Sequence, residues 1–112
     1  MKRIEILNIY RTLGRVKLNK VTDKELRNAL ISDHLRMFRV AKDNDDYVAS
    51  LREQFDPQAV KELNEAYQQY AQETVDVNFI LVSREAFGDA LAAGDVDFTL
   101  GEMALLDPIF KD

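Results

Sequence analysis

The 112-residue chain is long enough for one domain, and its composition, 46% apolar and 31% charged, is that of a folded globular protein and not of a disordered one. It contains no cysteine, which excludes disulfide bonds, a thiolate nucleophile and cysteine-ligated zinc. The net charge of −5 conceals a split, because residues 1–42 carry a net +7 and residues 43–112 a net −12. Such opposite blocks suggest that one half docks on the other, or on the opposite half of a neighbouring copy.

A short first helix is predicted over 4–13, because apolar residues recur there on one helical face and Gly14 follows as a stop. A second, long helix is predicted over 22–54. Thr22 and Glu25 have the spacing of a capping box at its start, and no glycine or proline interrupts it.

This long helix carries a heptad seam, in which residues recur at alternate spacings of four and three. Asp56 and Pro57 suit the N-cap and first position of a third helix over 57–74, which carries a similar seam. Because the break between them is short, the two helices are expected to form a long antiparallel hairpin over about 22–74. The seam of the long helix comprises Leu26, Leu30, Asp33, Met37, Val40, Asn44, Tyr47, Leu51 and Gln54.

Two members of this seam, Asp33 and Asn44, are polar. A buried polar residue in a seam fixes the register of two helices at a cost in stability. We therefore predict that Asn44 finds a hydrogen-bond partner across the hairpin, and that Asn44 or Tyr47 lies near Tyr67.

The spacing of apolar residues changes after residue 74 from the helical pattern to the alternation typical of a strand. Apolar and polar residues alternate at the start of 75–82 and an apolar run follows, which predicts a strand. Ser83 can cap a short helix, and residues 95–98 are a candidate second strand. Thr99 and Glu102 form another capping-box pattern, which opens a last helix.

The predicted fold class is therefore mainly α with a minor β component. It is a single domain over 1–112, in which a short N-terminal helix precedes the long hairpin and a small strand-containing tail follows over about 75–112.

The first half of the long helix carries a second apolar stripe, formed by Ile31, Leu35 and Phe38. The third helix is too short to cover this half, so the first helix, the tail or another subunit must do so. A contiguous exposed stripe usually marks an interface, and a symmetric dimer is the commonest way to bury one. We predict that these three residues form an interface for self-association, with Leu35 and Phe38 near its centre.

Signals for catalysis and metal binding are weak. His34 beside Asp33 could act as a general base, but no serine–histidine–acid spacing accompanies it, and a packing role is the simpler interpretation. The acidic turn 43–46 lacks the glycine and terminal glutamate of a calcium loop. No glycine-rich phosphate loop or nucleophile elbow is present. We predict no enzyme activity, no catalytic residue, no metal site and no cofactor.

Nucleic-acid binding is the alternative function. The bases that could contact phosphates are Lys24, Arg27, Arg36, Arg39 and Lys42. They are spread around the helix, and no nucleic-acid-binding module can be recognised in the sequence. Pairing of these bases with acidic residues is therefore the better interpretation. The aromatic side chains of Tyr10, Tyr67 and Tyr70 are more simply explained by core packing than by a binding face.

The pieces of the chain follow one another in a recognisable order: a short helix, a Lys-Leu turn, a long helix, a counter-helix, a valine-alternating strand and a small last helix. These elements include Glu5–Leu13, Lys17-Leu18, the run Arg27-Asn28-Ala29-Leu30 after Thr22, Val75–Val82 and Leu100–Ile109. This order resembles a family of small phage and prophage proteins of unknown function, encoded among structural and lysis genes. The resemblance implies a phage or prophage origin and a role in virion structure or assembly.

The function predicted from these observations is non-catalytic: a phage- or prophage-derived structural, assembly or interaction protein that acts through protein–protein contacts, with itself as one candidate partner. No signal-peptide pattern is visible, and no apolar run approaches the roughly 20 residues of a membrane-spanning helix. We therefore expect the protein in the cytoplasm of a host cell or in a virion, without a membrane partner.

Overall fold

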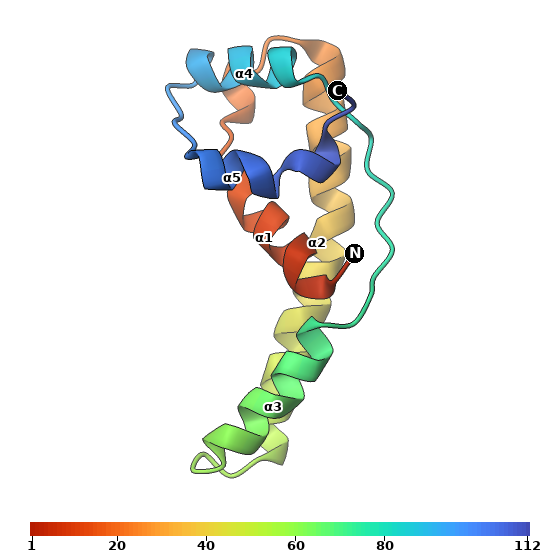
Figure 1. Cartoon of the computed structure of the whole chain (residues 1–112), viewed down its shortest axis with the longest axis vertical. Helices are drawn as coiled ribbons and strands as arrows, with labels where there is room; N and C mark the ends of the chain where they lie inside the picture. The colour runs from red at the N-terminus through yellow and green to blue at the C-terminus, as the bar shows by residue number, and fades with distance from the viewer.

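The computed structural model describes all residues from 1 to 112 and is mainly helical, as predicted. The long helix α2 runs through most of the molecule, with α1, α4 and α5 beside its N-terminal half and α3 beside its C-terminal half (Figure 1). The elements in chain order are α1 (Arg3–Leu13), the 3-10 turn η1 (Leu18–Lys20), α2 (Lys24–Gln54), α3 (Val60–Ala71), α4 (Arg84–Ala93), α5 (Leu100–Leu105) and the 3-10 turn η2 (Asp107–Ile109).

The start of α2 differs by one residue from the expectation. Its N-cap is Asp23, whose carboxylate accepts the Leu26 N–H at 3.0 Å, so the prediction that Thr22 caps the helix with Glu25 is wrong. Aspartate and threonine are both strong N-caps, and two adjacent candidates cannot be separated by spacing alone. The predicted caps of the last two helices are confirmed: Ser83 opens α4, and the capping box that begins at Thr99 opens α5. The prediction that Asp56 is the N-cap of the third helix is wrong.

The break after α2 is longer than predicted. The Asp56 carboxylate accepts the Gln58 N–H at 2.8 Å and so closes a local turn, which places Pro57 before α3 and not at its first position. The N-cap of α3 is Ala59, which makes no side-chain cap. Residues 55–59 therefore form a loop, and α3 is shorter than the predicted helix.

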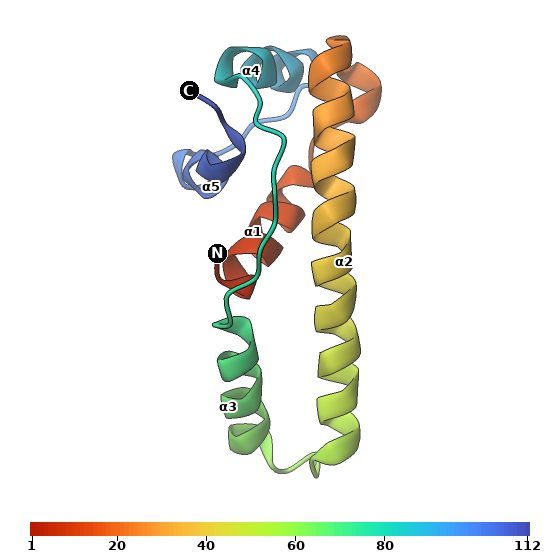
Figure 2. The same ribbon diagram turned by 90° about the vertical axis from the view of Figure 1, so that its right-hand side faces the viewer.

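Helix α3 turns back beside the C-terminal half of α2 (Figure 2). The rings of Tyr47 and Tyr70 stack there with centroids 3.9 Å apart, and Tyr70 takes the place that Tyr67 was expected to hold. Of the α3 residues only Ala71 is buried. The continuous heptad pairing expected of a long hairpin is therefore not confirmed.

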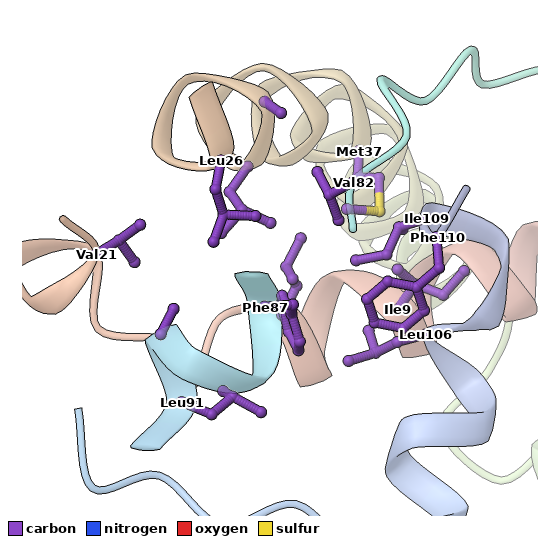
Figure 3. Packing of buried hydrophobic residues seen from close by; sticks show 14 of the residues in the cluster. Ile9, Val21, Leu26, Met37, Val82, Phe87, Leu91, Leu106, Ile109 and Phe110 are labelled. Carbon is purple, nitrogen blue, oxygen red and sulfur yellow. The ribbon is translucent and has the colours of Figure 1, made fainter. Parts of the chain in front are cut away.

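The hydrophobic core lies at the other end of α2. It is a cluster of 17 buried residues from α1, the first half of α2, α4, the α5–η2 segment and the positions that join them. Phe87 of α4 is fully buried and meets the Phe110 ring edge-on at 5.3 Å (Figure 3). Leu106 and Ile109 are buried near these rings, beside Ile9 of α1 (Figure 3). The tail thus covers the inner side of α2 together with α1.

The predicted strand over 75–82 is not formed, and neither is the one over 95–98. The 75–82 segment is extended and lies along α2 (Figure 2), with isolated bridges at its two ends, between Lys2 and Thr74 and between Val82 and Phe110. Its alternation has a different cause from sheet formation, because Val75, Val77 and Phe79 pack against the core while no second strand lies beside the backbone.

Candidate interaction surface

The predicted interface residues lie on the side of α2 that faces away from the core. Leu35 is 58% exposed and Phe38 is 47% exposed, while Ile31 is half-buried. In Figure 2 the helices α1, α3, α4 and α5 all lie to one side of α2. Only the turn that contains η1 reaches round its N-terminal end. The structure therefore leaves the second apolar stripe open.

This face of α2 forms a regular seam of its own. Residues recur along it at alternate spacings of four and three, as they do along the buried side. We call this set the outer seam; it comprises Lys24, Asn28, Ile31, Leu35, Phe38, Lys42, Asp45, Ala49 and Arg52. All of them except Ile31 are exposed. The apolar members form its centre, and polar or small residues occupy its two ends.

None of the ion pairs within the chain involves α2. The pairs join Arg3 to Glu73, Arg15 to Glu102 and Arg84 to Asp107. The first two connect the basic block of the sequence with the acidic block. The bases between 24 and 42 were expected near acids of the tail or of another copy, and no tail acid pairs with them. Apart from Asp33 and Arg36, which bind the tail, the charged side chains of α2 are thus free for contacts outside the chain.

Arg36 is the one base of α2 with a hydrogen bond to the tail, because its guanidinium donates to the backbone carbonyl of Asn78. Next to it, the Asp33 carboxylate accepts the Ile80 N–H through Oδ1 at 2.7 Å. These two bonds hold the extended segment against α2. They take the role that pairing with a neighbouring strand would have in a sheet.

Asp33 is fully buried, and its second oxygen, Oδ2, has no hydrogen-bond partner. Burial raises the pKa of this carboxyl above its ordinary value, and the Ile80 N–H and the Arg36 charge offset part of that rise. Asn44 is also buried, and its side-chain oxygen has no partner. The predicted bond from Asn44 across to α3 is therefore wrong for that oxygen, and the contact of α3 with α2 nearby is the aromatic stack of Tyr47 and Tyr70.

His34 has a packing role. Its ring stacks on Tyr10 with centroids 4.7 Å apart, which fixes α1 against α2. Asp33 is engaged with the tail, so the two neighbours in sequence do not form an acid–base pair. No group of three or more histidine, aspartate or glutamate side chains gathers in a metal-binding arrangement. This holds also for the acidic turn 43–46.

An open groove of about 330 Å³ lies between the start of α2 and the segment that leads into α4. Its walls are mixed, with Leu26, Ile80 and Leu81 beside Glu25 and Lys111. The hydroxyl of Ser83 in this groove accepts the Ala86 N–H as the cap of α4 and is used structurally. The groove has the size of a small-molecule pocket, but its polar groups do not form a nucleophile–base pair.

Comparisons with known proteins add no relative: no family model, no curated protein and no solved structure significantly matches this chain. None of the helices combines the length and the apolar composition that crossing a membrane requires.

Proposed function

We propose that this protein is a non-catalytic interaction or assembly protein, and that it works through protein–protein contacts on the outer seam of α2. The observation that carries the proposal is the contiguous apolar stripe on one helix, in which Leu35 and Phe38 are exposed and Ile31 is half-buried. Contiguous exposed apolar patches of this kind mark interaction sites, because burying them against a partner removes apolar surface from water.

The proposal includes a role for the shape of the molecule. The second half of α2 and α3 extend away from the core (Figure 1), and the molecule measures 49 × 25 × 22 Å. We propose that they act as an antiparallel hairpin arm, joined by the Tyr47–Tyr70 stack. A phage or prophage origin, with a role in virion structure or assembly, is part of the same proposal and rests on the order of elements in the sequence.

A test of this function uses a photoreactive amino acid at two exposed positions in cells that express the chain. Position 38 lies at the centre of the stripe, and Gln69 on α3 is exposed and serves as the matched control. We expect position 38 to give one protein adduct of defined mass, identified by mass spectrometry, and Gln69 to give none. Absence of a protein adduct at position 38, or crosslinking of nucleic acid there, would contradict the proposal.

A further inference from the structure

Charged side chains lie on both sides of the apolar centre of the outer seam, and its C-terminal half carries both signs, with Lys42 and Arg52 beside Asp45. Towards the N-terminus the exposed bases Lys24 and Arg27 precede the stripe, and towards the C-terminus the exposed acids Asp45 and Asp46 follow it. None of these four side chains has an ion-pair partner within the molecule. A partner that matched Arg27 and Asp45 would therefore place an acid opposite the first and a base opposite the second.

The spacing of these charges matches the periodicity of the helix. Arg27 and Asp45 are 18 residues apart, which is about five turns at 3.6 residues per turn, so they lie on one line along α2. Their midpoint falls between Leu35 and Phe38. If a second α2 lies antiparallel with Leu35 opposite Phe38, Arg27 comes within one residue, about 1.5 Å along the axis, of the position opposite Asp45 of the other copy.

We propose that the partner of the outer seam is a second copy of this chain, docked antiparallel about a two-fold axis near residues 35–38. Leu35 of each copy then faces Phe38 of the other, and Arg27 pairs with Asp45 at both ends. Lys42 falls opposite Ile31, where its aliphatic stem can cover the apolar side chain while its ammonium group stays in water. This inference rests on the proposed function, since it identifies the partner of the same surface.

The charges select this arrangement over the alternatives. A parallel pair would bring Arg27 against Arg27 and Asp45 against Asp45, and like charges in facing positions are destabilising. A partner of uniform charge would match Arg27 or Asp45 but not both. The antiparallel pair is closed, because both copies use the same patch, so it forms dimers and not filaments. Its apolar centre is small, and we expect a micromolar dissociation constant.

Charge reversal tests the pairing. Arg27→Glu and Asp45→Arg each turn both symmetric contacts into repulsions, so each variant alone should dimerise about tenfold or more weakly than the wild type. In a 1:1 mixture the two variants form a heterodimer in which both contacts are again attractive, and affinity should return. Lys61→Glu on α3 makes the same charge change as Arg27→Glu at another exposed site and should leave dimerisation unchanged.

The register is tested independently with single cysteines, which the chain lacks. Lys24 and Ala49 lie on the outer seam and face each other across the antiparallel pair. Lys24→Cys and Ala49→Cys should therefore form a mixed disulfide when oxidised together and few disulfides when oxidised alone. Homodisulfides of each variant alone would indicate a parallel pair and overturn the inference.

A monomeric wild type, or single charge variants that dimerise as the wild type does, would also overturn the inference. The proposed function could still hold after such a result, because it does not require that the partner is a second copy. If the chain is monomeric and position 38 crosslinks to an identified foreign protein, the homodimer is refuted but the interaction surface stands. The far-ultraviolet circular dichroism spectrum of every variant checks that the fold is unchanged.

Discussion

Asp33 is a carboxylate with no solvent exposure, and it binds the tail to α2 through one of its two oxygens. Its pKa is raised because burial penalises the charged form more than the Ile80 N–H and Arg36 stabilise it. The folded state therefore holds the proton to a higher pH than the unfolded state does. The stabilising effect of the neutral form is present below the ordinary pKa and is lost as pH rises through the raised pKa.

Replacement of Asp33 by asparagine should remove this pH dependence. The amide oxygen can still accept the Ile80 N–H, and the buried charge is gone. As pH rises from 3 towards 7, and so past the ordinary pKa of 3.8, the wild type should lose stability relative to Asp33→Asn. Melting temperatures of both proteins across this range measure the difference. A difference that stays constant with pH would show that the carboxyl is not perturbed.

Asn44 is a second buried polar residue, and its side-chain oxygen is unpaired. An unsatisfied buried polar group costs about 1–3 kcal/mol. Asn44→Leu should therefore raise the melting temperature by several degrees, while it loosens the pairing of α3 on α2. Thermal unfolding and proteolysis at the 55–59 loop would measure the two effects. A clear fall in melting temperature would show that Asn44 contributes an interaction that the structure does not reveal.

Among the elements, α2 shows how much of the fold can be read from the sequence. Its length, its buried seam and its exposed stripe all follow from the helical spacing of apolar residues. The 75–82 segment shows the opposite case. Its alternation correctly indicates one buried side, but alternation cannot reveal whether a second strand lies beside it. Here the backbone of the segment forms hydrogen bonds with the side chains of Asp33 and Arg36, and no sheet forms.

The cap of α2 gives a prediction at the same scale. Asp23→Ala removes the acceptor of the Leu26 N–H and should destabilise the protein by about 1 kcal/mol. Thr22→Ala, one residue earlier, removes a side chain that makes no cap bond and should have a much smaller effect. Denaturant unfolding of both variants compares them directly. Equal destabilisation by the two changes would return the capping role to Thr22.

For the whole molecule, the sequence predicted the charge split and the apolar stripe, but not how they combine. The blocks meet within the chain through Arg3 and Arg15, whereas the charged side chains of α2 other than Asp33 and Arg36 remain free. The 18-residue spacing of Arg27 and Asp45 was available in the sequence. It acquired meaning only once the structure showed that both lie on the open face of α2.

The exposed bases of α2 give the nucleic-acid alternative a direct test. They lie on several sides of the helix, so they do not form a continuous phosphate-binding track. We expect no shift of double-stranded DNA or of RNA in electrophoresis at 150 mM salt, and at most weak binding at 50 mM salt. Tight binding at 150 mM, with the steep salt dependence of phosphate contacts, would favour a nucleic-acid-binding protein instead.

The central claim is that the outer seam of α2 joins two copies of the chain. Sedimentation equilibrium of the wild type and of Phe38→Glu at about 100 μM, above a micromolar dissociation constant, tests it most directly. The wild type should sediment with twice its chain mass of 12.9 kDa, and Phe38→Glu should be monomeric with an unchanged far-ultraviolet circular dichroism spectrum. A wild type that is monomeric at this concentration, or a Phe38→Glu variant that is still dimeric, would contradict the claim.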